Sequence, residues 1–252
     1  MPKISKVNLI VEQGNTCTKA AVCHRDGIEA VFMYKDFDCS ALLPLLEQYK
    51  PVRGIFSSVT GTDAATVAFL KERLQTFILF DKTTRVPLQV GYDTPETLGR
   101  DRLAAAVGAS YLHPSRDLLV IDAGTAITFE LIEASGLYVG GNISPGLTTR
   151  FKALNFYTKR LPLVTEQEDV PLIGRHTEEA VRAGVVNGMV YEIRGYMETL
   201  RERYPDLLVF LTGGHSFYFE RRLKKHTFAG LYADINLVLT GLNRILEYNV
   251  EN

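Results

Sequence analysis

The feature of this sequence that most constrains its fold is a pattern that occurs twice. VEQGNTCTKAAV (residues 11–22) and IDAGTAITFELI (121–132) each contain an apolar run, an acidic residue, one further residue, a glycine, a nearby threonine and a second apolar run. The two copies lie close to half the chain length apart. Internal similarity of this kind is typical of chains built from related units. The repeat therefore predicts two α/β domains, 1–115 and 116–252, with a ligand-binding cleft between them.

The hydrophobic periodicity predicts alternating strands and helices around both copies. The strands expected in the first half are 7–12, 18–25, 28–35, 52–59 and 77–80, with a hairpin turn at Asp26-Gly27. Its helices are expected at 40–49, at 63–74 with Thr62 or Asp63 as the cap, and through RLAAAVGASYL. The second half is expected to contain strands near 118–122, up to 132, from 138 and at 207–214, and helices near 146–160, 176–203 and 232–248.

The composition excludes several classes of function. The chain is 46% hydrophobic and 23% charged, with a formal net charge of −1. This balance gives no overall electrostatic attraction for nucleic acid or for an anionic membrane. MPKISK at the start has no apolar stretch behind it, so it does not fit a signal peptide, and no apolar run reaches the roughly 20 residues of a spanning helix. Three cysteines without a disulfide-like pattern suit a reducing compartment, so we expect a cytoplasmic protein.

The two acidic turns are suited to holding phosphate groups. A glycine lets the backbone approach a ligand closely, and successive N–H groups in a turn can bind phosphate oxygens. The carboxylates of Glu12 and Asp122 would repel phosphate unless a cation such as Mg²⁺ lies between them. Acid-x-Gly also occurs in ordinary turns after strands, and a single copy would favour that interpretation. Neither copy is a GxxxxGK[ST] loop or a dinucleotide-binding fingerprint.

The segment GYDTPETLGRDR (91–102) interrupts the apolar pattern just before a predicted helix. A kinase needs a group that accepts the proton of the attacking hydroxyl, and the carboxylate of Asp101 could do this. Arg102 could hold an anionic part of a substrate, because its planar fork matches a carboxylate. Alternatively, the two residues could be an exposed pair at the start of the helix, where Asp is favoured in the first turn.

Three further stretches have a candidate role. GGNISPG (140–146) suggests a chain that passes close to a ligand or to the other domain, or else a glycine-rich loop before a helix. LTGGH (211–215) could pass under a nucleotide base, whereas His215 is better explained as incidental than as catalytic. Thr177 is expected to be the N-cap of a helix with Glu178 and Glu179 in its first turn.

Together these segments resemble the type III pantothenate kinases, which belong to the actin-like ATPase superfamily. GYDTPETLGRDR is similar to the family's substrate segment Y-x-x-P-x-x-L-G-x-D-R at every fixed position, and VEQGNTCTK and IDAGTAITFE resemble its two phosphate loops. GGNISPG and Leu161-Pro162 match as well, so the resemblance covers nearly the whole chain in order. It implies two ribonuclease-H-like domains and transfer of the ATP γ-phosphate to the 4′-hydroxyl of pantothenate, the first committed step towards coenzyme A.

The resemblance also implies a role for particular residues. Asp101 would be the general base. Pantothenate would contact Tyr92, Gly99, Arg100, Asp101, Arg102 and Thr177. ATP would contact Glu12, Gln13, Gly14, Asn15, Thr16, Cys17, Thr18 and Lys19, together with Thr125. Asp122 would bind a monovalent cation, K⁺ or NH₄⁺, in addition to the Mg²⁺ that accompanies ATP. The implied assembly is a homodimer with substrate-site residues from both subunits.

Two residues depart from the pattern of the family that the chain resembles, and two other functions stay open. Glu12 and Glu130 stand where that family usually has Asp, so each side chain is one methylene longer. A shift of about an ångström in the position of a reacting group can cost roughly 10²-fold in rate. The first alternative is a kinase of the same superfamily with another hydroxylated substrate. The second is a nucleotide-binding regulatory protein with weak catalysis, against which stands the intact segment from Tyr92 to Arg102.

Overall fold

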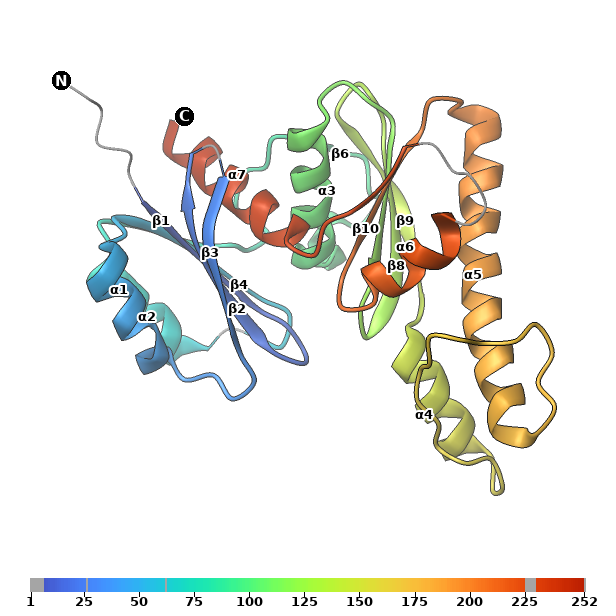
Figure 1. Cartoon of the computed structure of the whole chain (residues 1–252). Helices are drawn as coiled ribbons and strands as arrows, with labels where there is room; N and C mark the ends of the chain where they lie inside the picture. Colours follow the sequence, from blue (N-terminus) through green and yellow to red (C-terminus); the bar gives the residue numbers. More distant parts are fainter. Residues whose placement is uncertain (1–6, 26, 62, 225–229, 252) are drawn as a thin grey trace. The chain divides into compact units, whose positions relative to one another are not determined.

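The computed structural model describes residues 7–25, 27–61, 63–224 and 230–251 (Figure 1). Asp26 and Thr62 of the expected turn and cap therefore lie outside the described residues. The chain divides into two compact units, each an α/β structure with its own sheet. The first comprises Met1–Pro114, Gly136–Tyr138 and Asn236–Asn252, and the second comprises Ser115–Ser135 and Val139–Ile235. The sequence predicted a single boundary between residues 115 and 116. The structure instead places Asn236–Asn252 in the first unit, because the C-terminal helix packs there.

The first unit is built on a five-stranded sheet of order β3-β2-β1-β4-β5. Its strands are β1 (Asn8–Gln13), β2 (Thr18–His24), β3 (Gly27–Tyr34), β4 (Arg53–Ser58) and β5 (Thr76–Leu79). β1, β2 and β3 form an antiparallel meander, and β4 and β5 add in parallel to β1. The expected hairpin between β2 and β3 is confirmed by the pairing of His24 with Gly27.

Helices cover both faces of this sheet. The helical elements of the unit are η1 (Cys39–Leu42), α1 (Leu43–Tyr49), α2 (Ala64–Arg73), η2 (Pro95–Thr97), α3 (Arg100–Leu112) and α7 (Leu237–Glu251). Asp63 is the N-cap of α2, with its side chain accepting a hydrogen bond from Ala65 N. Leu9 and Val11 of β1 pack with α1 and α2 in one hydrophobic cluster. Because side chains alternate along a strand, Asn8, Ile10 and Glu12 face the opposite side, where α7 lies (Figure 1).

A buried polar cluster ties α7 to the central strands. The Asn8 amide nitrogen donates to Asn243 Oδ1 at 2.9 Å and to Glu247 Oε1 at 2.6 Å. Arg53, on β4, donates to both carboxylate oxygens of Glu247 at 3.2 and 3.1 Å. Asn243 in turn donates to the carbonyl of His24 at the end of β2. Since buried charges and amides are costly when unpaired, this cluster fixes the position of α7 along β1 and β4.

α3 and α7 approach each other so closely that their backbones touch. A Cβ atom added at Gly241 would lie 1.8 Å from the carbonyl oxygen of Ala104, and one added at Gly108 would lie 2.3 Å from the carbonyl oxygen of Leu237. Each helix therefore presents a glycine to the other at the crossing point. Through this contact, the position of α7 on the sheet also determines the position of α3.

The second unit is built on a six-stranded sheet of order β11-β10-β7-β8-β9-β6, whose edge strand β6 (Gln89–Val90) belongs to the first unit. Its strands are β7 (Leu118–Ala123), β8 (Ala126–Ile132), β9 (Leu137–Pro145), β10 (Leu208–Thr212) and β11 (Leu231–Ala233). β7 and β8 form an antiparallel hairpin, and β10 and β11 add in parallel to β7. The first two residues of β9, Leu137 and Tyr138, belong to the first unit and pair with β6 (Gln89–Val90). Neither β6 nor β11 was expected from the sequence.

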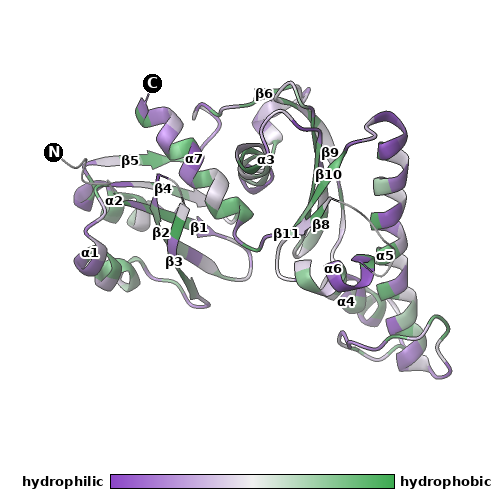
Figure 2. Ribbon diagram, turned by 45° about the horizontal axis from the view of Figure 1, so that its top comes forward, coloured by the Kyte–Doolittle hydropathy of each residue, from purple (hydrophilic) through white to green (hydrophobic). Residues whose placement is uncertain are grey.

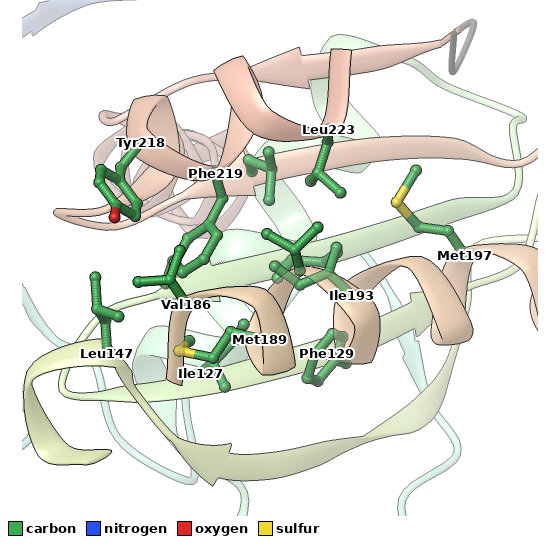
Figure 3. Close-up of a cluster of buried hydrophobic side chains, with 14 of the residues drawn as sticks. Ile127, Phe129, Leu147, Val186, Met189, Ile193, Met197, Tyr218, Phe219 and Leu223 are labelled. Atoms are coloured by element: carbon green, nitrogen blue, oxygen red, sulfur yellow. The ribbon is translucent and has the colours of Figure 1, made fainter. Parts of the chain in front are cut away.

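The helices α4 (Leu147–Tyr157), α5 (Thr177–Arg203) and α6 (Ser216–Lys224) complete this unit. α5 and α6 enclose one hydrophobic core with the sheet, which Figure 3 shows with Met189 and Ile193 of α5 facing Phe219 of α6. Figure 2 shows apolar and polar residues alternating along α5, as a half-buried helix requires. Among the described residues, no helix is both long enough and apolar enough to cross a membrane. α6 was missed from the sequence, although Ser216, Phe219 and Leu223 have helical spacing and are buried.

The glycine contact between α3 and α7 gives a first prediction. Gly241→Ala places a methyl group against the backbone of α3, and overpacking of this kind costs about 1–3 kcal/mol or more. We expect the free energy of unfolding in urea to fall by at least this amount. Gly195→Ala on α5, where an added Cβ meets nothing within 4 Å, is the matched control and should be neutral or stabilising. Equal stability of the two variants would contradict the role of this crossing.

Candidate active site

The first acidic turn connects β1 to β2. Glu12 pairs with Lys19 and Gln13 with Thr18, so Gly14 to Cys17 form the turn itself. The N–H of Gly14 donates to the carbonyl oxygen of Cys17 at 3.0 Å, which closes the turn. Asn15 and Thr16 are exposed at its tip. The turn therefore presents backbone N–H groups and a threonine hydroxyl to a ligand, as phosphate binding requires.

Glu12 lies at the end of β1 on the face that carries α3 and α7. Burial raises the pKa of its carboxyl above the ordinary value, the charge of Lys19 opposes the rise, and the charge of Asp101 adds to it. The structure thus brings Glu12 and Asp101 together from positions far apart in the sequence. Two carboxylates in a partly buried site repel each other, and a bound cation would relieve that repulsion.

Asp101 occupies the first turn of α3, where the local sequence holds its side chain in place. Its Oδ1 accepts a hydrogen bond from the N–H of Arg102 at 2.9 Å. A Cβ at Gly99, the N-cap residue, would lie 2.7 Å from the same oxygen, so a larger residue there would displace the carboxylate. Asp101 does lie in the first turn of α3, but the alternative of an exposed pair is wrong, because Asp101 is half-buried and Arg102 is buried.

Arg102 and Tyr92, from opposite ends of the segment 91–102, contact each other. The guanidinium carbon of Arg102 lies 5.8 Å from the centroid of the Tyr92 ring, within the range of a cation–π contact. Tyr92 packs edge-to-face against Tyr138, with ring centroids 6.3 Å apart. Arg102 is only 7% exposed, so its charge lies in a partly desolvated position where a carboxylate of a ligand would bind strongly.

Arg100 points to a different place from its two neighbours. Its guanidinium donates to the carbonyl oxygens of Pro95 at 3.0 Å and Asp81 at 3.5 Å and lies 5.8 Å from the ring centroid of Phe80. It lines a cavity together with Leu103, whereas that cavity includes neither Asp101 nor Arg102. Among the segment's residues that were expected to contact pantothenate, Arg100 is thus turned towards the end of β5.

The second acidic turn connects β7 to β8 and is one residue shorter. Asp122 pairs with Thr128, and the N–H of Gly124 donates to the carbonyl oxygen of Ala126 at 3.0 Å. A Cβ at Gly124 would lie 3.3 Å from Asp122 Oδ1, the same distance that separates a Cβ at Gly14 from Glu12 Oε1. The two turns therefore share a local geometry in which the glycine lies directly beside the carboxylate.

Gly146 of GGNISPG and Gly213 of LTGGH both lie against the second acidic turn. Gly213, with φ +85°, ends β10 against the second turn, and a Cβ there would lie 2.2 Å from Asp122 Oδ1. Gly146 donates to the carbonyl oxygen of Thr125 at 3.1 Å, and the hydroxyl of Thr149 donates to the same oxygen at 2.6 Å. GGNISPG thus passes close to the second turn, within its own unit. Glycine is required at both positions because the chain passes against the turn.

The position of Thr177 differs from the one expected. His176 is the N-cap residue of α5, without a side-chain hydrogen bond, and Thr177 is the first helical residue. The N–H of Arg175 is satisfied instead by the carboxylate of Glu179 at 2.6 Å. The N-cap prediction for Thr177 was therefore wrong, because the extended backbone of His176 places the cap position one residue earlier. Thr177 is exposed, and its hydroxyl is not used as the helix cap.

Sequence reasoning missed Tyr138 as a part of these sites, and it named Gly213 only within the stretch LTGGH, without its partner. Tyr138 is fully buried against Tyr92 although it comes from the start of β9, and only the pairing of β6 with β9 brings the two rings together. Gly213 carried a signal, since paired glycines after an apolar strand suggest a close approach, but its partner Asp122 could not be identified from spacing. Glu130 is fully buried on β8 opposite Val120, so it belongs to the interior of the sheet.

The carboxylates that could hold cations are few. Among the described residues, no three His, Cys, Asp or Glu side chains gather closely enough to bind a metal ion by themselves. Mg²⁺ is usually bound by one or two carboxylates together with substrate phosphates and waters, rather than by an all-protein cage. Glu12 could therefore hold Mg²⁺ that arrives with a nucleotide. Asp122 offers a carboxylate oxygen next to Gly124 and Gly213.

The raised pKa of Glu12 gives a second prediction. In magnesium-free buffer, the folded protein keeps a proton on Glu12 at pH values where the unfolded chain has lost it, so the free energy of unfolding falls as the pH rises above about 4.5. Glu12→Gln should remove this penalty. The variant should therefore exceed the wild type in melting temperature by more at pH 7 than at pH 4.5. Glu47→Gln, which removes the same charge from an exposed position on α1, is the control and should leave the pH dependence unchanged.

Comparison with known proteins identifies the family. The model of the type III pantothenate kinase family matches residues 8–199. The type III pantothenate kinase of Phocaeicola vulgatus is 47% identical over 244 residues, which cover 96% of this chain and 99% of the relative, and that of Bacteroides fragilis is 44% identical over 243 residues, which cover 96% and 98%.

The fold is also found in solved structures. A protein from Campylobacter jejuni titled as a Baf family transcriptional activator aligns with a TM-score of 0.63 at 22% identity, covering 97% of this chain and 100% of that one. The activator of 2-hydroxyisocaproyl-CoA dehydratase from Clostridium difficile, with bound ADPNP, aligns with a TM-score of 0.54 at 12% identity, covering 97% and 94%. At these identities the likeness supports the actin-like ATPase fold alone. On the sequence matches, the chain belongs to the type III pantothenate kinase family.

Proposed function

We propose that this protein transfers the γ-phosphoryl group of ATP to the 4′-hydroxyl of pantothenate. The observation that carries the proposal is the placement of Asp101 at the start of α3, beside Glu12 and within the segment that contains Tyr92 and Arg102. Phosphoryl transfer requires little covalent chemistry from the protein, but it requires a positioned base, a held acceptor and neutralised charge. The residues of this segment can supply the first two.

In the proposed mechanism, the oxygen of the 4′-hydroxyl attacks the γ-phosphorus while Asp101 accepts the proton of that hydroxyl. The bond from that phosphorus to the bridging oxygen breaks, and ADP leaves. The hydrogen bond from the Arg102 N–H and the close approach of Gly99 hold the carboxylate in one orientation, so little reorganisation is needed. Arg102 binds the carboxylate of pantothenate, which is a small acid, and Tyr92 positions the guanidinium by stacking on it.

The proposal assigns ATP to both acidic turns. Glu12 to Lys19 would contact its phosphates through backbone N–H groups and the Thr16 hydroxyl, and Thr125 would do so from the second turn. Mg²⁺, held by Glu12 and the phosphates, neutralises the charge on the transferred group. Asp122 would bind K⁺ or NH₄⁺, for which its carboxylate beside Gly124 and Gly213 provides a ligand.

We also assign a homodimer to this protein, with Thr177 contributing to the substrate site. In the second unit, large apolar side chains are exposed at the end of α4 and in the segment before α5. Phe156 and Tyr157 are 79% and 82% exposed, and Leu172 and Ile173 are 69% and 77% exposed. Exposed apolar groups of this size mark interaction surfaces. Thr177, the first residue of α5, follows Ile173 closely in the chain. A second copy bound to the exposed apolar residues before α5 would therefore cover Thr177 as well.

The role of Asp101 gives a third prediction. Asp101→Asn keeps the size of the side chain but removes the base, so kcat for pantothenate phosphorylation should fall by about 10²–10⁴. Binding of ATP, measured by calorimetry, should change little. Asp93→Asn, in an exposed position of the same segment, is the matched control and should keep normal turnover. Full activity of the Asp101 variant would contradict its assignment as the base.

The dimer gives a fourth prediction. The double variant Phe156→Ser/Tyr157→Ser removes two exposed aromatic side chains without touching the core, so the fold should persist while the dimer dissociates. Light scattering after size exclusion measures the mass, and circular dichroism controls for folding. If Thr177 acts from the partner subunit, KM for pantothenate should rise as the dimer dissociates. A monomeric wild-type protein would overturn the assignment.

A further inference from the structure

A cavity of about 340 Å³ lies on the side of the acceptor segment that faces away from Asp101. We call it the α3 cavity, and its lining falls into two parts. Val86, Val90, Leu98 and Leu103 make up the apolar part of the lining, which we call the floor, and Lys82 and Arg100 add two positive charges to it. Leu98 and Leu103 are almost fully buried, so the floor is part of the packed interior rather than a mobile surface. The volume is within the range of small-molecule sites.

Arg100 is the side chain in this cavity that most needs an anion. Burial lowers the pKa of its guanidinium, and the charge of Asp81 only partly opposes this effect. The hydrogen bonds of the guanidinium go to the backbone carbonyls of Pro95 and Asp81, which are neutral acceptors. The Asp81 carboxylate accepts hydrogen bonds through its Oδ1 from Thr83 and Thr84. A partly desolvated cation with neutral acceptors gains most from a bound negative group.

The remaining charges around the cavity favour the same class of ligand. Lys82 is exposed beside Arg100, and the acidic residue of the lining, Glu96, is exposed on the η2 turn. Lys82, Arg100 and Glu96 of the lining therefore sum to one positive charge at neutral pH, and Asp81 is close enough to Arg100 for their charges to interact. An apolar floor together with two cations suits a molecule with a negative head and a short hydrocarbon chain, whereas a bare inorganic ion would leave the floor wet.

We propose that the α3 cavity binds a small organic anion, with its charged group at Lys82 and Arg100 and its short apolar chain on the floor formed by Val90, Leu98 and Leu103. This site is separate from the proposed acceptor site, because Arg100 and Leu103 lie on one face of α3 while Asp101 approaches Glu12. Arg100 directly precedes Asp101 and holds the carbonyl of Pro95, so a ligand that binds this guanidinium acts on the segment that carries the base.

The test measures binding in the full-length protein without ATP or pantothenate, so its outcome is independent of the kinase assay. Methyl-labelled protein is titrated with butyl phosphate, butyrate and butylammonium, and the methyl signals of Leu98, Leu103, Val86 and Val90 are followed by NMR. We expect saturable shifts with the two anions and none with butylammonium. Tighter binding of butyl phosphate than of butyrate would identify a phosphate monoester, and the reverse order a carboxylate, as the preferred head group.

Two variants make the result decisive. Lys82→Gln should weaken binding of both anions by about tenfold, because one charge-assisted contact is lost. Lys71→Gln, which removes the same charge from an exposed position on α2, should leave binding unchanged. Both positions are exposed, so neither variant is expected to disturb folding. Equal shifts with all three probes, no shifts at all, or unchanged affinity in the Lys82 variant would overturn the proposal.

Discussion

The contact on which the candidate active site depends is the close approach of α3 and α7. Gly108 and Gly241 let the two helix backbones meet, and the buried cluster around Glu247 fixes α7 on β1 and β4. As a result, α3 has one position relative to β1, and the first turn of α3 comes to lie beside the last residues of that strand. The charges of Glu12 and Asp101 interact because of this helix packing, since no local sequence signal joins the two residues.

The candidate active site lowers the free energy of unfolding of the unliganded protein. Burial of the Glu12 carboxyl, which raises its pKa, is an arrangement that an unliganded protein would be more stable without. The cost is offset elsewhere in the same unit, by the polar cluster of Asn8, Asn243 and Glu247 and by the apolar layer under α1 and α2. A site of this kind is expected to gain stability when cation and nucleotide bind.

The two acidic turns show how similar loops can be supported differently. Both place a glycine beside the carboxylate, and both close with a hydrogen bond from that glycine. The first turn is one residue longer, and the second is packed against Gly213 and Gly146, while both turns have exposed residues at their tips. Their difference in support agrees with the different roles proposed for Glu12, with Mg²⁺ and phosphate, and for Asp122, with a monovalent cation.

The sequence by itself determined the hairpins, most of the helices and the two acidic turns, because period-two and period-3.6 patterns and turn residues are local properties. It could not place the C-terminal helix in the first unit, nor pair Tyr92 with Tyr138, nor set Gly213 against Asp122. It also predicted Thr177 as the N-cap of α5, whereas His176 occupies that position in the structure. These relations join residues far apart in the chain or depend on competition between neighbouring side chains. They follow from long-range packing and strand order, and only the tertiary structure decided them.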